Sequence, residues 1–497
     1  MLSTLKDIFE KLNENEVRYV HWKSNEHLKS ALSGKTDLDI LVHQLDYHKF
    51  IEVVNKHGFK KYDTDPLLNY SFIDDFIGFD NNTGDLIHLH THFQLVIGKK
   101  FVKEIHLPIE EYIFKHFIKD VDSGVKIIDP NLEIILLLIR FNIKYEGKFK
   151  KPTKLNNEYE IEYNWLINKI DEKLVKEHAL NIFDKKTSNV FFKTINHIDK
   201  KRKFKQLRKN IFKKTNKYKT NRNFINNIKY YISKVKFIYK AILVKKFHIP
   251  IKFRRTKPNS GLIIAFMGVD GAGKSTLVNY TEKWLSNKVD VHKVYFGTGD
   301  STFSLLRTPI VNIKKITNKL KFKNNNKSKK VIVNSKETKS NNKHRNIFTK
   351  FIKVIWALVV ALEKKNSFKK LWKAKSSGMV VITDRYPQVD IYGFNDGPLL
   401  TDWLKSKNLV KRQMSRWEYN VYNLGKFYKP DLVIKLIVSE DISSKRKSDT
   451  SKEMITKKIE AIKKIKIHPE SNELLLNTEE SLEKTKLNLK LIIKDYI

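Results

Sequence analysis

The sequence predicts an α/β protein of two or three domains, and three observations lead to that prediction. The chain has 497 residues, more than one hydrophobic core usually serves. Apolar strand-like runs alternate with helix-like segments through residues 261–497, a pattern typical of a parallel sheet with helices on both faces. Residues 1–129 instead mix helices with short strands and a hairpin signal, which predicts an α+β domain.

The composition is strongly basic and free of cysteine. Lys and Arg number 97 and Asp and Glu 54, which gives a net charge of +43. Such an excess attracts phosphates, nucleic acid or anionic lipid, but lysine is abundant throughout the chain, so compositional bias is the explanation we favour. The absence of cysteine excludes disulfides, thiolate catalysis and cysteine metal sites.

The pattern of a signal peptide or a membrane span is not found in the two best candidate segments. Residues 1–16 have the pattern of an amphipathic helix that contains acids. Residues 347–362 are strongly apolar, but Lys350 and Lys353 interrupt them, and the apolar part is shorter than the ~20 residues that cross a bilayer. We therefore expect a buried helix there and a cytoplasmic protein.

The first elements of the N-terminal domain follow from their residue patterns. Strands are predicted at residues 17–22 and 38–42, and a helix is predicted at residues 47–57. Residues 70–79 and 86–96 flank an Asn-Asn-Thr-Gly run, which is a strong hairpin signal.

Helices follow, and the composition then changes. Pro130 opens an apolar helix, and a further helix is predicted at residues 161–174. Lys, Asn and aromatic residues dominate residues 199–255. Apolar residues at helical spacing lie between lysines in this connector: Ile228, Ile232, Val235, Ile238 or Tyr239, and Ile242. We expect this helix to pack on its neighbours, and the alternative is contact with a membrane surface or a protein partner through residues 228–246.

The domain boundaries follow from these changes. We divide the chain into an N-terminal domain with a helical extension at residues 1–198, a basic helical connector at 199–258 and a C-terminal domain at 259–497. Residues 321–345 interrupt the last domain, because they are rich in Lys, Asn and Ser and are expected to form a mobile loop.

A phosphate-binding motif stands at the start of the C-terminal domain. The apolar run at residues 262–267 has the character of a central parallel strand. It leads into GVDGAGKST at residues 268–276, which fits G-x-x-x-x-G-K-[ST], and a helix pattern follows. A chance glycine-rich turn would not bring strand, motif and helix in this order. The residues expected to bind ATP are Gly268, Gly271, Gly273, Lys274, Ser275 and Thr276.

Each fixed position of this motif has a chemical reason. The glycines let successive backbone N–H groups approach phosphate oxygens, and the helix N-terminus adds a favourable dipole. Lys274 supplies positive charge for the terminal phosphates, and the Ser275 hydroxyl is placed for Mg²⁺. The motif therefore predicts a site for ATP and Mg²⁺, which an ATPase, a GTPase or a small-molecule kinase would share.

The C-terminal domain resembles thymidylate kinase and, more widely, the nucleoside monophosphate kinases. Three segments carry the resemblance, and they follow one another along the chain in the same order as in that family. Residues 266–276 look like the first motif of that family, and residues 380–386, which end in Asp-Arg-Tyr, look like its strand-terminal motif. Residues 430–436 look like the strand that precedes the lid. The resemblance covers residues 261–497 and implies the parallel sheet of a P-loop NTPase and phosphoryl transfer from ATP to a nucleoside monophosphate.

Two residues at a strand end have roles that chemistry supports without the family. Asp384 lies at the sheet edge where open α/β folds bind ligands, so its carboxylate can hold Mg²⁺ or its waters. Arg385 can clamp the phosphate of the acceptor. A structural ion pair is the alternative for these two. The resemblance adds that Asp270 faces the acceptor and that Arg307 contacts its phosphate.

The lid candidate is residues 443–458, where three cations follow one another at positions 445–447. Some thymidylate kinases carry a catalytic arginine inside the phosphate loop, and this chain has Gly271 at that position. It therefore resembles the subtype whose charge comes from the lid, and we expect Arg446 to neutralise charge in the transition state. A solvated basic run is the alternative. The predicted catalytic residues are then Lys274, Asp384, Arg385 and Arg446.

Two departures from the family concern the acceptor. Residues 297–300 lack the usual Glu-Pro-Gly turn, and Asp396-Gly397-Pro398 stands where a Ser and an Ala-Tyr-Gln run usually form the thymine pocket. The resemblance therefore implies the phosphate machinery and leaves thymidine specificity open.

The N-terminal domain resembles the nucleotidyltransferase superfamily in one stretch. Residues 34–42 form a small-residue turn followed by a strand with Asp37 and Asp39, which project to one face and suit a two-metal magnesium site. His88 falls where the family has a third acid, and Asp85 lies on the wrong side of the alternation. The site is thus degenerate, which leaves a binding or regulatory domain open. His88, His90 and His92 share one strand face, so a metal site is a further alternative.

We interpret the chain as a kinase that uses ATP and Mg²⁺ to phosphorylate a nucleoside monophosphate or another phosphorylated small molecule. One alternative is nucleotidyl transfer by the N-terminal domain, with the P-loop domain as a nucleotide sensor. The other is a non-enzymatic basic protein that binds nucleic acid or anionic membrane. No base-reading aromatic surface is recognisable, so nucleic acid is the partner least expected. The acceptor, the pathway and the formation of a homodimer stay open.

Overall fold

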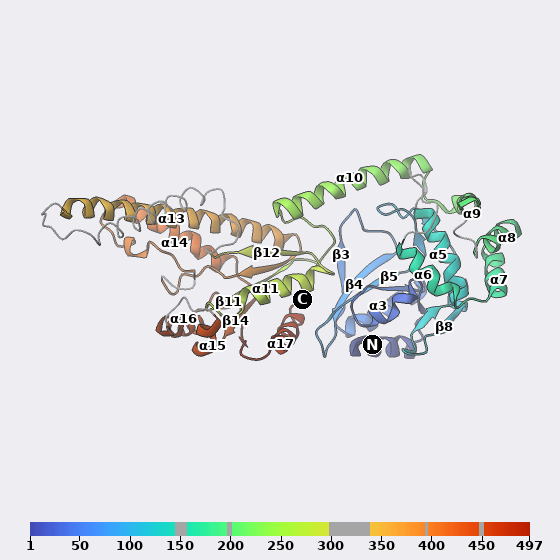
Figure 1. Cartoon of the computed structure of the whole chain (residues 1–497), viewed down its shortest axis with the longest axis horizontal. Helices are drawn as coiled ribbons and strands as arrows, with labels where there is room; N and C mark the ends of the chain where they lie inside the picture. The colour runs from blue at the N-terminus through green and yellow to red at the C-terminus, as the bar shows by residue number, and fades with distance from the viewer. Residues whose placement is uncertain (145–156, 196–200, 298–337, 393–395, 447–451) are drawn as a thin grey trace, which may run out of the picture. The chain divides into compact units, whose positions relative to one another are not determined.

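The computed structural model describes residues 1–144, 157–195, 201–297, 338–392, 396–446 and 452–497, with the side chains of residues 201, 338–350 and 452 excepted. These residues form two compact units. The first unit contains residues 1–259, 287–290 and 490–495, and the second contains residues 260–286, 291–489 and 496–497. Figure 1 shows the elements of both.

A mixed eight-stranded sheet is the centre of the first unit. Its strand order is β10-β3-β4-β5-β2-β1-β9-β8, and a separate pair consists of β6 and β7. The predicted hairpin is present, because β4 and β5 pair antiparallel with Phe79 opposite Leu86. The strands are β1 (Tyr19–His21), β2 (Leu38–Val42), β3 (Lys60–Thr64), β4 (Ile73–Phe79), β5 (Leu86–His92), β6 (Val96–Ile97), β7 (Ile105–His106), β8 (Phe117–Lys119), β9 (Lys126–Ile128) and β10 (Arg255–Thr256).

Four helices accompany this sheet in the first part of the chain. The apolar faces of α1 and α3 share one buried cluster with the sheet, in which Phe50 packs edge-on against Phe76. This packing fixes the face of the sheet on which β2 and β5 place their polar residues. The helices are α1 (Ser3–Glu14), α2 (Leu28–Leu32), α3 (Tyr47–Lys56) and α4 (Glu110–Lys115).

A helical extension follows the sheet within the first unit. The apolar helix predicted from Pro130 is present and is buried over most of its length. The helix predicted at residues 161–174 is two helices, because Asp171 accepts hydrogen bonds from the N–H groups of Lys173 and Leu174 and so begins a new one. The helices are α5 (Pro130–Lys144), α6 (Asn157–Ile167), α7 (Glu172–Ile182), α8 (Lys185–Ile195), α9 (Lys201–Thr215) and α10 (Asn223–Phe247).

The connector helix α10 packs on the first unit, but its apolar stripe does not make the contact. It contacts the rest of the unit through a face with Asn226, Tyr230 and Ser233, which are buried. The apolar stripe that includes Ile232 and Val235 is exposed. The helix thus packs on its unit through the opposite face, where the rings of Tyr230 and Phe237 contact Phe101, and not through the stripe.

The second unit is built on a five-stranded parallel sheet of order β12-β13-β11-β14-β15. Every residue of β11 and β13 is buried, as expected for central parallel strands. The strands are β11 (Leu262–Gly268), β12 (Val291–Tyr295), β13 (Val380–Asp384), β14 (Leu432–Ile437) and β15 (Asn472–Asn477). The helices are α11 (Lys274–Ser286), α13 (Thr338–Ser376), α14 (Leu409–Phe427), α15 (Glu440–Arg446), α16 (Lys452–Lys464) and α17 (Leu482–Lys494), of which residues 490–494 are counted with the first unit. The α/β fold class is thus confirmed.

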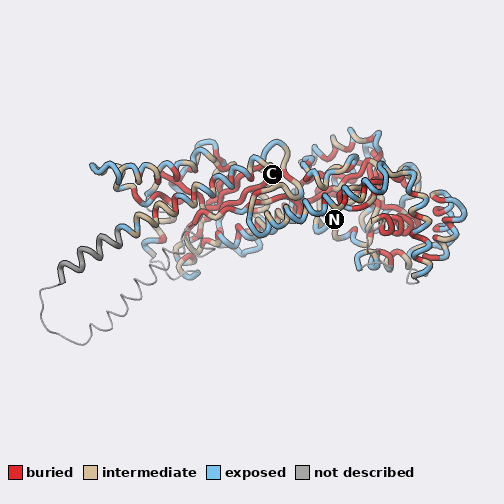
Figure 2. Tube along the Cα trace, turned by 90° about the horizontal axis from the view of Figure 1, so that it is seen from above, coloured by how far each residue is buried: buried red, intermediate tan, exposed pale blue. Residues whose placement is uncertain are grey.

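The long helix α13 runs beside α14 in Figure 1 and corrects one prediction. Residues 338–345, expected at the end of a mobile loop, belong to this helix, and residues 321–337 lie outside the described part of the chain. The apolar stretch at residues 347–362 forms part of α13, where Ala357, Val360 and Ala361 are buried. Figure 2 colours the described residues by burial and shows that buried and exposed positions alternate along the helices. Among the described helices, none combines the length and the apolar character needed to cross a bilayer.

Candidate functional site

The phosphate loop connects the central strand β11 to α11. Both neighbours of β11 run parallel to it, so the loop stands at the carboxyl edge of the sheet, where open α/β folds bind ligands. Gly271 and Gly273 have φ values of +83° and +81°, which glycine adopts without strain. They turn the chain into α11, whose first residue is Lys274. The strand, loop and helix therefore occur as the motif predicts.

Lys274 lies within the loop and is shielded from solvent. Its ammonium donates a hydrogen bond to the Val269 carbonyl oxygen at 2.7 Å, and only 7% of the residue is exposed. Burial and, second, the positive charge of Arg385 lower the pKa of Lys274 to about 8. Phosphate oxygens bound by the loop would replace the carbonyl as the partner of this ammonium.

Ser275 and Asp384 are brought together from α11 and β13. The Ser275 hydroxyl donates to Oδ2 of Asp384 at 3.2 Å. The other carboxylate oxygen, Oδ1, is buried and has no hydrogen-bond partner among the described residues. A hydroxyl beside a carboxylate with an uncommitted oxygen suits Mg²⁺, which prefers oxygen ligands and keeps several waters. These two side chains therefore fit the ion that the motif predicts.

Arg385 is held between two carboxylates. Its Nη2 donates to Oδ1 of Asp270 at 3.1 Å, and its Nη1 donates to Oδ2 of Asp396 at 3.4 Å. Burial alone would lower the pKa of Arg385, but these two carboxylates outweigh it and raise the pKa above its ordinary value. The residue has a φ of +69°, an uncommon conformation for a side chain of this size. The guanidinium is thus charged and fixed at the end of β13.

Two lysines that the sequence analysis did not single out complete this cluster. Lys458 of α16 donates to Oδ2 of Asp270 at 2.9 Å, and Lys364 of α13 lies 3.6 Å from Oδ1 of Asp396. Burial would raise the pKa of Asp270, but the hydrogen bond from Lys458 and the charge of Arg385 hold the pKa well below its ordinary value. Each acid that holds Arg385 is therefore shared with a lysine.

Two predicted residues are not seen beside the loop. Arg307 lies outside the described residues. Arg446 ends α15, where its Nη2 donates to the Thr478 carbonyl oxygen at 3.1 Å. Within the described part of the lid candidate, Lys458 is the cation that contacts a loop residue.

The helix α15 packs directly on the phosphate loop. The Ser443 hydroxyl donates to the backbone carbonyl of Asp270 at 2.8 Å. A Cβ atom at Gly271 would lie 2.8 Å from the Ser443 carbonyl oxygen, closer than side chains tolerate. The positive φ of Gly271 and this contact together favour glycine at position 271.

The first unit brings together the predicted acids and histidines of β2 and β5. Asp37 lies directly before β2, with Oδ1 at 2.9 Å from Nδ1 of His88 and 2.5 Å from the ammonium of Lys288, a residue of the same unit. Burial would raise the pKa of Asp37, but His88 and Lys288 lower it far below its ordinary value. Asp37 is thus already neutralised by groups of the chain itself.

Asp75 of β4 is a central residue that the sequence analysis missed. Its Oδ1 lies 2.7 Å from Nε2 of His88, 2.9 Å from Nδ1 of His90 and 3.1 Å from Nε of Arg255. The hairpin places Asp75 directly opposite His90, so counting back from the predicted turn would have found it. Asp75 places a third carboxylate near Asp37 and Asp39, but imidazoles and a guanidinium already engage it.

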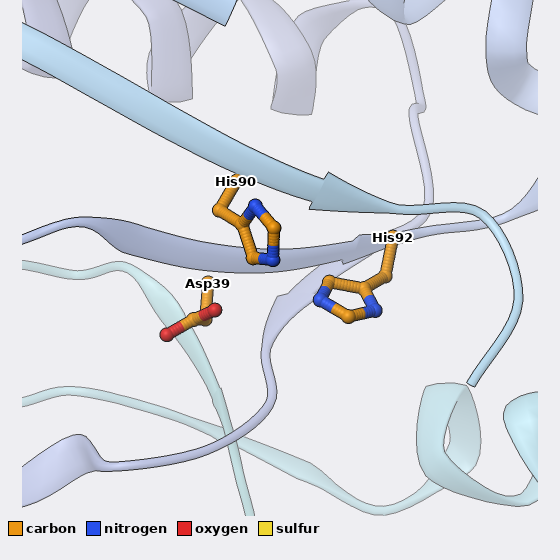
Figure 3. Close-up of side chains that lie close together, drawn as sticks. All are labelled: Asp39, His90 and His92. Carbon is orange, nitrogen blue, oxygen red and sulfur yellow. The ribbon is translucent and has the colours of Figure 1, made fainter. Parts of the chain in front are cut away.

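Asp39, His90 and His92 form a second group on the same face (Figure 3). Asp39 lies opposite His90 in the parallel pair of β2 and β5. One potential ligand atom from each of the three residues lies within 4.8 Å of the others. Lys23 contacts Oδ1 of Asp39 at 2.9 Å. The predicted acid pair is thus divided, since Asp37 faces His88 and Asp39 faces His90 and His92.

A cavity of about 360 Å³ adjoins this region of the first unit. The acidic and imidazole groups of Asp37, Asp75 and His90 form one part of its wall. The rest of the wall combines cations with aromatic rings and includes Lys100, Arg254, Arg255, Tyr70, Phe237 and Phe253. Such a lining suits a flat anionic compound.

Comparisons with known proteins show distant similarity over part of the chain. The "Uncharacterized ATP-binding protein YghR" of Escherichia coli K12 is 28% identical over 210 residues, which are 41% of this chain and 75% of that protein, and its counterpart in Escherichia coli O6:H1 gives the same values. The "Uncharacterized ATP-binding protein YghS" of Escherichia coli K12 is 28% identical over 204 residues, 40% of this chain and 78% of that protein. No protein-family model matches the chain. The chain is therefore a distant relative of proteins named as ATP-binding, and its parallel sheet is consistent with a P-loop domain.

Proposed function

We propose that the second unit transfers the γ-phosphoryl group of ATP to a phosphorylated small molecule, such as a nucleoside monophosphate. The observation that carries this proposal is the convergence of Lys274, Ser275, Asp384 and Arg385 at the carboxyl edge of one parallel sheet. The names of the relatives support the nucleotide, because both are described as ATP-binding.

The nucleotide side of the reaction is assigned to the loop and its lysine. Backbone N–H groups around Gly271 and Gly273 would cradle the phosphates, and Lys274 would replace its bond to Val269 with one to a terminal phosphate. Ser275 and Asp384 would hold Mg²⁺, which supplies charge neutralisation on the phosphates when it is bound. Positioning and electrostatics of this kind carry most of the catalysis in phosphoryl transfer.

The acceptor side is assigned to Arg385. A guanidinium fits a phosphate through two parallel hydrogen bonds, and Asp270 and Asp396 keep this one oriented before the acceptor arrives. Lys458 already contacts Asp270 and is the first candidate to neutralise charge in the transition state. Arg446 remains the second candidate, and it would have to leave the Thr478 carbonyl to act.

A product screen tests the proposal. The purified chain, ATP and Mg²⁺ are incubated with nucleoside monophosphates and with sugar phosphates, and the products are separated by mass. We expect one acceptor to gain a phosphoryl group, with turnover abolished in Lys274→Ala and preserved in Lys283→Ala, which removes an exposed lysine of the same helix. Equal turnover in both variants would remove Lys274 from the site.

Nucleotidyl transfer by the first unit is the second candidate function. The cavity with aromatic and cationic walls beside Asp37 and Asp75 favours it, because a nucleotide has a flat base and an anionic tail. Pyrophosphate release from ATP or CTP that disappears in Asp39→Asn would support it. The engagement of Asp37 and Asp75 by groups of the chain argues for binding without transfer, in which case nucleotide binds but pyrophosphate is not released.

A further inference from the structure

His92 is a buried residue whose polar atoms have nothing to bind. It ends β5, none of its surface is exposed, and its ring packs edge-on against Trp22 with centroids 5.1 Å apart. Within the described residues, neither Nδ1 nor Nε2 has a hydrogen-bond partner. A buried polar group without a hydrogen-bond partner destabilises the folded state, so a ligand bound at His92 would recover free energy that the folded chain lacks.

The neighbours of His92 complete a set of metal ligands. His90 lies two residues earlier on the same face of β5, and Asp39 lies opposite His90 on β2. Nδ1 of His90 is engaged by Asp75, which leaves Nε2 for an ion. A carboxylate that orients a ligating histidine in this way is the usual outer-shell arrangement of metal sites.

We propose that Asp39, His90 and His92 bind one transition-metal ion of the zinc class and leave a further coordination position open. Two imidazoles and one carboxylate suit Zn²⁺, whereas Mg²⁺ prefers a shell of oxygens. The proposed site differs from the two-metal magnesium site that the superfamily resemblance implies, because Asp37 does not take part. Lys23 remains on Oδ1 of Asp39 and leaves Oδ2 for the metal.

Titration with zinc alone tests this site in the full chain. The protein is treated with EDTA and dialysed, and zinc chloride is added in a calorimeter near neutral pH. We expect one tight equivalent in the wild type and a loss of at least tenfold in affinity in His92→Gln and in Asp39→Asn. Lys23→Met removes a competing cation and is expected to tighten binding. Cobalt substitution, followed by visible absorption, reports the same site independently of calorimetry.

The control is His48→Gln, which removes an exposed histidine from the same unit. Its affinity for zinc is expected to equal that of the wild type. If His48→Gln and His92→Gln bind zinc equally well, the zinc is bound by scattered surface histidines and the proposal is overturned. The absence of a tight zinc equivalent in the wild type would also overturn it. If His92→Gln fails to fold, the zinc affinity of Asp39→Asn decides the question, because Asp39 is partly exposed and its substitution is expected to leave the fold intact.

A separate observation concerns the exposed stripe of α10. The face opposite Asn226, Tyr230 and Ser233 is apolar, and Val235 and Tyr239 at its centre are 67% and 62% exposed. The stripe repeats every three or four residues along the helix, which is the spacing of one helical face. It consists of Ile225, Ile228, Ile232, Val235, Tyr239 and Ile242.

Lysines border this stripe on both sides. At 100° per residue, Lys229 and Lys236 project along one border and Lys234 and Lys245 along the other, and all four are exposed. The sequence has no acidic residue from position 200 to position 269, so no carboxylate of α10 itself offsets this charge.

We infer that α10 lies on an anionic lipid surface, with its apolar stripe in the headgroup region and its lysines at the lipid phosphates. Burial of apolar area and the attraction of each lysine to the anionic surface would together hold the chain there. A second copy of the chain is a poorer occupant, because an antiparallel pairing of two stripes would bring rows of lysines against each other. An RNA partner would leave the aliphatic side chains unused.

Vesicle flotation with the full chain tests the inference. Phosphatidylcholine vesicles with and without phosphatidylglycerol are compared at low and high salt. We expect binding only with phosphatidylglycerol, weakened by salt, and at least tenfold weaker in Val235→Glu. Leu45→Glu is the matched control, because Leu45 is an exposed apolar residue of the same unit outside α10. Equal binding by the two variants, or binding to RNA without binding to vesicles, would refute the inference. A dimer detected by light scattering would also refute the inference if Val235→Glu dissociates it and Leu45→Glu does not.

Discussion

The lowered pKa of Lys274 predicts how ATP binding depends on pH. In the free protein this ammonium loses its proton near pH 8 because it is buried and lies near Arg385. The bound triphosphate requires the protonated form, so above pH 8 the protein must take up a proton to bind ATP. The dissociation constant is therefore expected to rise about tenfold between pH 7 and pH 9, since each pH unit above the pKa costs about 1.4 kcal/mol.

Calorimetry with Mg²⁺ between pH 7 and pH 9.5 measures this dependence. Near pH 9, buffers that differ in ionisation enthalpy should report uptake of about one proton for each ATP bound. Lys274→Arg is the control, because a guanidinium stays charged throughout this range and removes the contribution of residue 274 while retaining a cation. The reasoning fails if the wild type and Lys274→Arg show the same change in affinity with pH.

Three further predictions concern single side chains. Asp384→Asn should raise the Mg²⁺ concentration that half-supports nucleotide binding at least tenfold, as measured by magnesium titration, because it removes a charged ligand beside Ser275. Lys458→Met should lower kcat about 10²-fold with little change in KM for ATP, whereas Lys463→Met, on the exposed side of the same helix, should leave kcat unchanged. Burial and, second, the charge of Glu162 raise the pKa of Glu133 from an ordinary value of 4.5 to about 8. Between these two pH values the folded chain keeps a proton that the unfolded chain releases, so the free energy of unfolding falls as the pH rises from about 4.5 to 8. Glu133→Gln cannot ionise, so its unfolding free energy relative to the wild type should increase from pH 5 to pH 9 in urea titrations, and a constant difference would contradict this assignment.

The phosphate loop was predictable because its chemistry is contiguous. Neighbouring residues determine strand β11, the two glycines with positive φ and the start of α11, so one stretch of sequence contains the whole phosphate-binding loop. Asp384 was predictable for a related reason, since an acid at the end of an apolar strand must lie at the ligand edge of a parallel sheet.

The cations around Arg385 were not predictable in this way. Lys458 stands 188 positions from Asp270, and only the packing of α16 brings them together. In a chain with so many lysines, no local pattern distinguishes Lys458 from the other cations of the lid candidate. Arg446 was predicted instead because it lies within three consecutive cations. The exposure of the α10 stripe was not predictable for a different reason, because helical periodicity shows that an apolar face exists and does not show what covers it.

The contact between Gly271 and Ser443 also limits how this chain can change over generations. An arginine at position 271 would need both a change of the backbone φ of +83° and a movement of the α15 backbone, and that movement would cost the hydrogen bond from Ser443 to Asp270. Whichever change comes first, the intermediate protein is expected to be less stable. A lineage that keeps this packing is therefore expected to keep glycine at position 271.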